Sequence, residues 1–228
     1  SPLTEPQTLD RVEAAARRLQ PVTEELPTTF EGRFLHAEET PWGWFIIGDT
    51  LANVYAGPAA IIVDLGGDDT YLAGPGAPVD APVALVIDLA GDDRYIGNRA
   101  GSLGGALTGV GLLVDRHGDD TYAGDVLTQG AAFCGVGVLW DAGGHDTYLA
   151  QHSSQGAGFF GAGLLIDHQG DDLLSLGQLG QGLGGAHGVG LLLDGGGRNR
   201  YVADLKVSSG YDTPGVYNGW SQGIGVGF

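Results

Sequence analysis

Short apolar runs recur along the chain, and each run ends at an aspartate. Residues 112–115 read Leu-Leu-Val-Asp, and residues 164–167 read Leu-Leu-Ile-Asp. A glycine follows the aspartate by three residues, a second aspartate or an asparagine by five, and a tyrosine or leucine by seven. Successive first aspartates are 24, 27, 26, 26 and 27 residues apart, and they are Asp64, Asp88, Asp115, Asp141, Asp167 and Asp194. This spacing indicates a repeat protein in which each repeat is one structural unit.

The repeat predicts strands rather than helices. Each apolar run lies between glycine-rich segments, and no stretch after residue 40 has the 3.6-residue period of a helix. Short strands in a repeat of about 26 residues indicate an all-β fold, a parallel β-helix (β-solenoid) with three sides per coil. Equivalent residues of neighbouring coils then stack in rows about 4.8 Å apart. A propeller is disfavoured, because each of its blades needs about 40 residues.

Alternation along each strand separates the apolar residues into two rows. We expect the first and third residues of each run, such as Leu112 and Val114, to point into the solenoid. The middle residues are then expected to point outward, and they are Ile62, Val86, Leu113, Leu139, Leu165 and Leu192. An exposed aliphatic row of this length needs a cover.

Residues 1–40 differ in pattern from the rest of the chain. Leu9, Val12, Ala16, Leu19 and Val22 have helical spacing, with Glu and Arg on the opposite face. We therefore predict a helical or capping segment over 1–40 and the solenoid over 41–228. Because one short helix cannot cover every coil, we expect a second chain or domain to cover the rest of the aliphatic row.

The two ends of the repeat are irregular. Residues 45–48 with Asn53 and Tyr55 form a degenerate copy, which predicts a shortened first coil. At the other end, residues 204–219 interrupt the repeat as an insertion, and residues 221–228 begin a further coil that is incomplete. The chain is therefore expected to hold six to seven coils, and either further polypeptide or a second chain or domain is expected to complete the last one.

The acidic residues are sorted by type along the chain. The net charge is −18, all seven Glu lie at or before Glu39, and 20 of the 21 Asp lie after it. Such a charge repels phosphate backbones, so we expect no nucleic-acid partner. Stacked carboxylates about 5 Å apart repel one another by about 3 kcal/mol at an effective dielectric constant near 20, so the aspartate rows call for compensation by cations or by backbone N–H groups.

The aspartate corners resemble a known calcium-binding repeat. Residues 67–71 and 118–122 both read Gly-Asp-Asp-Thr-Tyr, which is similar to the second half of the RTX β-roll repeat G-G-x-G-x-D-x-U-x. The resemblance covers the corners only, since Asp64-Leu65 and their equivalents replace the first two glycines and each coil has one such corner rather than two. It implies calcium between stacked turns, with side-chain ligands from Asp69, Asp93, Asp120, Asp146 and Asp172.

We expect the metal ligands to come from fourteen corner aspartates. The alternative is that these residues only cap turns through their own backbone hydrogen bonds. The sixth corner, with Arg198 and Asn199, is expected to end the row. The expected ligands are Asp64, Asp68, Asp69, Asp88, Asp92, Asp93, Asp115, Asp119, Asp120, Asp141, Asp146, Asp167, Asp171 and Asp172.

These features lead to two functional hypotheses. The first is a calcium-stabilised module of a secreted or cell-surface protein with a structural or binding role. The second, by analogy with other parallel β-helices, is a polysaccharide-active glycoside hydrolase or lyase with carbohydrate as its ligand. No motif in the sequence identifies catalytic residues. No apolar run reaches the roughly 18 residues of a membrane span.

Overall fold

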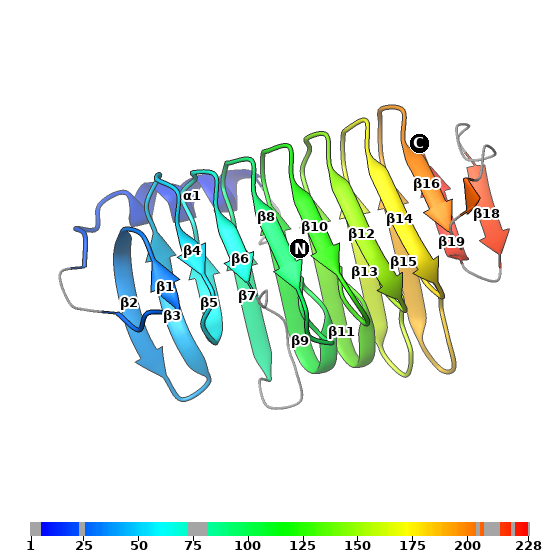
Figure 1. Cartoon of the computed structure of the whole chain (residues 1–228), viewed down its shortest axis with the longest axis horizontal. Coiled ribbons are helices and arrows are strands. Elements are labelled where there is room, and N and C mark those ends of the chain that lie inside the picture. Colours follow the sequence, from blue (N-terminus) through cyan, green and yellow to red (C-terminus); the bar gives the residue numbers. More distant parts are fainter. Residues whose placement is uncertain are drawn as a thin grey trace.

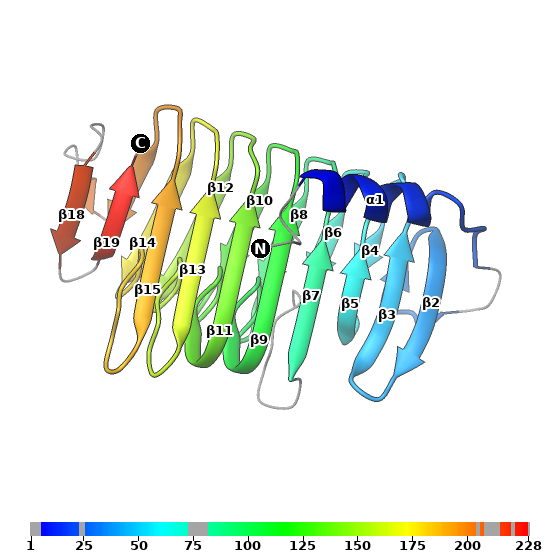
Figure 2. The ribbon, with the colours of Figure 1, turned by 180° about the vertical axis from the view of Figure 1, so that it is seen from behind.

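The computed structural model describes residues 6–22, 26–72, 82–203, 206–207, 215–219 and 222–227. These residues form one helix and two long sheets that face each other across the core of a β-solenoid (Figures 1 and 2). Equivalent residues of neighbouring coils pair in parallel and in register, for example Leu113 with Leu139 and Leu139 with Leu165. The solenoid with coils of about 26 residues is therefore confirmed.

The two sheets alternate along the chain. Sheet A contains, in spatial order, β1 (Phe30–Glu31), β4 (Val54–Tyr55), β6 (Thr70–Leu72), β8 (Arg94–Gly97), β10 (Thr121–Gly124), β12 (Thr147–His152), β14 (Leu173–Gln178), β16 (Arg200–Ala203) and β17 (Lys206–Val207). Sheet B contains β18 (Gly215–Gly219), β19 (Gln222–Gly227), β15 (Val189–Asp194), β13 (Ala162–Asp167), β11 (Ala132–Asp141), β9 (Ala106–Asp115), β7 (Val83–Ile87), β5 (Ala59–Val63), β3 (Gly43–Gly48) and β2 (Phe34–Thr40).

The expectation of three sides per coil is wrong, because the described strands form two sheets. The segment between them, such as residues 125–131, is a corner joined to its neighbours by backbone hydrogen bonds. The N–H of Gly130 donates to the carbonyl of Leu103 at 3.0 Å, and that of Gly156 donates to Gln129 at 3.0 Å. Gln129 and Gly130 turn the chain with φ angles of 53° and 71°, so the third segment bends where a strand would run straight.

The row of middle apolar residues points inward, so the expected orientation is also wrong. Ile62, Val86, Leu113, Leu139, Leu165 and Leu192 are 0–3% exposed. They pack in one core with the sheet A tyrosines, five of which, from Tyr55 to Tyr148, form a continuous stack of rings 4.5–4.8 Å apart. The aspartate two residues after each middle residue shares its face, so the observed orientation also buries the aspartates, whose hydrogen bonds are described below.

The helix α1 (Pro6–Ala16) covers part of the outer face of sheet B (Figure 2). Leu9 and Ala16 are buried in a second cluster with Ile87 and Val114. The helix thus packs on the third residues of the apolar runs at the N-terminal coils, not on the middle row that it was expected to cover, and it ends before Leu19 and Val22. Farther along the same sheet face, Val136 and Val189 are 40% and 65% exposed.

The ends of the solenoid depart from the parallel pattern. β2 pairs antiparallel with β3 at the N-terminal end, and Tyr55 pairs with Tyr71 in the shortened first coil. At the C-terminal end, β19 adds to β15 in parallel and β18 adds to β19 antiparallel. The insertion expected over 204–219 falls largely on 204–205 and 208–214, which lie outside the described residues. No helix in the described part of the chain is long and apolar enough to span a membrane.

Candidate metal centre

The first aspartate row lies at the C-terminal ends of the sheet B strands. Its members are 0–2% exposed, and they are Asp64, Asp88, Asp115, Asp141, Asp167 and Asp194. The side chains point inward because each aspartate follows a buried middle residue by two positions in an extended strand. In-register pairing then stacks Asp115, Asp141 and Asp167 directly on one another.

Each first-row carboxylate accepts hydrogen bonds at both oxygens. In the first five members, one oxygen accepts the backbone N–H two residues ahead, as in Gly143 to Asp141 at 2.8 Å, whereas in Asp194 this oxygen accepts the side-chain N–H of Asn199. The other accepts the hydroxyl of a tyrosine from the preceding coil, as in Tyr122 to Asp141 at 2.6 Å and Tyr148 to Asp167 at 2.8 Å. This accounts for the repeat spacing, in which glycine permits the turn and tyrosine brings a hydroxyl to the next coil.

The last member of this row obtains its hydroxyl differently. The preceding coil has Leu174 at the tyrosine position, and leucine offers no donor. Tyr201 of the same coil donates to Asp194 instead, at 2.5 Å. The pairing of carboxylate with hydroxyl is thus retained where the repeat changes.

The second aspartate row lies across the corner from the first. Its members are 1–2% exposed, and they are Asp69, Asp93, Asp120, Asp146 and Asp172. Oδ1 of each accepts the backbone N–H of the equivalent residue one coil earlier, as in Asp93 N–H to Asp120 Oδ1 at 2.7 Å. Oδ2 of every member is buried and has no hydrogen-bond partner. Five buried carboxylate oxygens therefore lack the partner that such atoms normally have.

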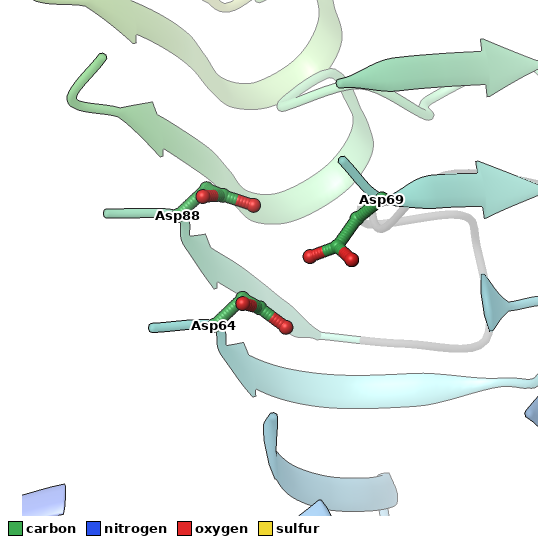
Figure 3. Close-up of side chains that lie close together, drawn as sticks. All are labelled: Asp64, Asp69 and Asp88. Atoms are coloured by element: carbon green, nitrogen blue, oxygen red, sulfur yellow. The ribbon is translucent and has the colours of Figure 1, made fainter. Parts of the chain in front are cut away.

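The two rows together form five clusters of three carboxylates. Each cluster joins one second-row aspartate to two successive first-row aspartates, as in Asp64, Asp69 and Asp88, with one oxygen of each lying within 4.8 Å of the others. Figure 3 shows the carboxylate of Asp69 extending from its corner toward Asp64 and Asp88. The other clusters are Asp88–Asp93–Asp115, Asp115–Asp120–Asp141, Asp141–Asp146–Asp167 and Asp167–Asp172–Asp194.

The remaining predicted ligands lie outside these clusters. Asp68, Asp92, Asp119 and Asp171 are exposed, and their side chains accept backbone N–H groups from the next coil along the outer surface of the corner. The hydrogen bonds from Arg198 hold the pKa of Asp171 below its ordinary value. The structure thus brings together ten of the fourteen predicted aspartates, and it adds Asp194, which has the same repeat position as the first-row members.

Burial raises the pKa of every first-row and second-row aspartate. It is the largest cause in each case, and repulsion between neighbouring carboxylates adds to it at most of these positions. The pKa rises to about 6 for Asp172 and to about 7 for Asp194. Among the described residues, no Arg or Lys forms an ion pair with any of these carboxylates. The buried charge must therefore be neutralised by bound protons or by cations.

Asparagines occupy the second-row position at both ends of the row. Asn53 lies one coil before Asp69, and its side-chain N–H donates to Asp64 at 3.4 Å. Asn199 lies one coil after Asp172, and its side-chain N–H donates to Asp194. At each end of the row, an asparagine side-chain N–H therefore donates to the last first-row carboxylate, Asp64 or Asp194. At the equivalent repeat position, each of the five clusters instead has the Oδ2 atom of a second-row aspartate without a partner.

The donor set fits a hard cation. The clusters contain only carboxylate and phenol oxygens, without histidine or cysteine, and Ca²⁺ takes six to eight oxygen ligands whereas softer metals select nitrogen or sulfur. The three carboxylates of a cluster and the nearby tyrosine hydroxyl supply oxygens of the required kind. The sequence predicted that the corner with Asn199 ends the row, but it assigned no role in this site to Asn53 or to the tyrosine hydroxyls, although their constant repeat positions were visible.

Comparisons with known proteins add no relative. No family model, no curated protein and no solved structure matches the chain significantly.

Proposed function

We propose that this chain is a structural or binding module whose solenoid is stabilised by calcium ions in the five inner aspartate clusters. The observation that carries the proposal is the row of five buried Oδ2 atoms without a partner. Asn53 and Asn199 support it, because each donates a side-chain amide N–H to a terminal first-row carboxylate, whereas the inner second-row positions hold carboxylates that cannot do so when ionised. A cation in each inner cluster would supply the missing positive partner.

The charge of the two rows also supports a divalent ion. The six first-row and five second-row aspartates carry eleven negative charges when ionised, and five divalent cations carry ten positive charges. Buried charges of one sign are costly unless they are paired in this way. Five monovalent cations would leave about half of the charge unbalanced.

The proposed setting is extracellular or at the cell surface. Calcium sites of extracellular modules have dissociation constants of about 10⁻⁴ to 10⁻³ M, which suits calcium as a permanent structural component outside the cell. The outer surface of the solenoid would then be free to present binding groups, with carbohydrate as a proposed ligand.

Catalysis on polysaccharide receives no support from the clusters. A glycosidase needs carboxylates that flank a bound sugar. The inner aspartates are 0–2% exposed, so they are out of contact with any polymer on the surface. Their arrangement suits a structural ion rather than a reacting substrate.

Calcium content and thermal stability test the proposal together. Protein unfolded in urea with EGTA and then refolded in calcium should retain about five calcium ions per chain after desalting, measured by elemental analysis. It should melt at a higher temperature than protein refolded in EGTA, whereas refolding in the same concentration of sodium should have little effect. Absence of both bound calcium and a melting shift would refute the proposal.

A further inference from the structure

We infer that the five clusters form one closed row, which takes up its cations while the coils stack and releases them only when coils separate. The inference rests on the proposed calcium role and concerns how the same sites fill and empty. It follows from what surrounds the row on its sides and at its ends.

The first wall is the stack of aromatic rings in sheet A. Tyr71, Tyr95, Tyr122 and Tyr148 are 0% exposed. Adjacent rings lie 4.5–4.8 Å apart with interplanar angles of 6–12°, which is close to van der Waals contact along the whole stack. Each hydroxyl is bonded to a first-row aspartate, so the rings close the row on this side.

The second wall is the backbone of the corner between the two aspartate rows. Successive corners are joined by hydrogen bonds, as in Gly91 N–H to the carbonyl of His117 at 3.0 Å. A methyl group added at Gly118 would overlap the carbonyl oxygen of Gly91, and one added at Gly144 would overlap that of Gly118. Adjacent corners are thus in direct contact, and they leave no room for an ion with its water shell to pass.

The ends of the row are closed as well. At the N-terminal end, Asn53 bonds to Asp64, and Phe34, which is buried, packs on Tyr55 with ring centroids 5.7 Å apart. At the C-terminal end, the Asn199 amide donates to Asp194 and to the carbonyl of Gly196. Passage along the solenoid axis is therefore blocked by side chains at both ends.

Two parts of this enclosure differ in strength. The tyrosine stack is fully buried at its centre, whereas Tyr201 at the C-terminal end is only half-buried. Separation of the last coil therefore exposes the Asp167–Asp172–Asp194 cluster before the others. Local opening of terminal units commonly needs less free energy than opening of central ones.

A chelator chase tests the inference. The chain is refolded from urea in the presence of calcium-45, desalted and mixed with excess EGTA, and the retained label is followed beside far-ultraviolet circular dichroism. Release should be slow, should be unchanged over a roughly tenfold range of EGTA concentration, and should accelerate with urea in parallel with the unfolding rate. Asn199→Ala should release about one ion in five faster than the wild type, whereas the exposed control Asp119→Asn should behave like the wild type.

The possible failures are distinguishable. Loss of all label within seconds from protein that keeps its native spectrum would overturn the enclosure and leave the calcium proposal standing. Protein that holds no calcium after loading would overturn the proposed function, and the enclosure with it. Release that rises in proportion to EGTA concentration would show that the chelator reaches the ions in the folded state, which also overturns the enclosure.

Discussion

Asp120→Asn should separate the role of a second-row carboxylate from that of its side-chain shape. Asn can keep the bond in which the side-chain oxygen accepts the N–H of Asp93, now at 2.7 Å. Its amide can also donate to Asp115, as Asn53 and Asn199 do toward their own first-row neighbours. We therefore expect the variant to fold and to hold about four calcium ions in place of five.

The magnitude follows from the spacing of the charges. Oxygens of Asp115, Asp120 and Asp141 lie within 4.8 Å of one another. Two unit charges at that distance repel by about 3.5 kcal/mol at an effective dielectric constant near 20, and proton sharing at neutral pH reduces this. Without calcium, the variant should be about 1–3 kcal/mol more stable than the wild type, which corresponds to a melting temperature higher by about 2–12 °C.

The assay compares urea unfolding in EGTA and in calcium, with ion content measured beside it. The matched control is Asp119→Asn on the same corner, because Asp119 is exposed and lies outside the clusters. The control should leave stability in EGTA and ion content close to those of the wild type. A less stable Asp120→Asn in EGTA, or one that still binds five ions, would refute the reasoning.

The remaining predictions concern pH, the tyrosine hydroxyls and the outer face. In EGTA, the melting temperature should be highest near pH 4 and should fall as the pH rises through about 6 to 7. The reason is that the folded-state pKa values of Asp172 and Asp194 are raised to about 6 and 7, so the folded chain binds more protons than the unfolded chain in this range. Calcium should reverse this trend, and a melting temperature in EGTA that does not change with pH would contradict the prediction. Tyr122→Phe keeps the ring in the stack but removes the hydroxyl that donates to Asp141. Urea unfolding in EGTA should therefore show a free energy of unfolding lower by about 1–3 kcal/mol. An unchanged free energy of unfolding would count against a contribution from that bond. A second copy of the chain is expected to cover the outer face of sheet B, because β7, β9, β11, β13 and β15 carry no charged side chain on that face and homodimer interfaces are more apolar than other protein interfaces. Light scattering should show a dimer, and Val136→Glu or Val189→Glu should convert it to a monomer. A monomeric wild type would refute this prediction.

Much of the architecture could be predicted because the repeat spacing in the sequence equals the number of residues in one coil. The sequence separation between Asp115 and Asp141 is one such coil length, and the structure pairs these two residues in register. The shortened first coil was also predictable, since Asn53 and Tyr55 retain their repeat positions. The number of sides was not predictable from residue types, because a corner such as 125–131 contains apolar residues that could equally form a strand. It bends because Leu127, Gln129 and Gly130 have positive φ angles, which the sequence does not reveal.

The orientation of the strands was mispredicted for a physical reason. Because all three residues of each run are apolar, hydrophobicity alone does not show which face of the strand points into the core. The prediction of the inward face therefore depended on the position of the aspartate that follows the run. Charged side chains usually lie outside. Here Asp141 is buried because it accepts one N–H and one hydroxyl, and those partners come from Gly143 and from Tyr122 of another coil. Only the stacking of coils reveals both partners.

The candidate site was predicted by residue type but not by arrangement. The adjacent aspartates of one corner, such as Asp119 and Asp120, are indistinguishable in the sequence. Alternation sends the first outward and the second inward, so only the second joins a cluster. Asp194 belongs to the first row because it pairs in register with Asp167.

The asparagine ends make the length of this protein adjustable. Each coil contacts only its neighbours, and residues 116–141 contribute one first-row aspartate, one second-row aspartate and one tyrosine. Duplicating that segment would add two buried negative charges and one further cluster, so with its own divalent ion the added coil brings no net charge to the interior. The chain can thus lengthen by gene duplication without accumulating internal charge, provided that Asn53 and Asn199 remain at the two ends.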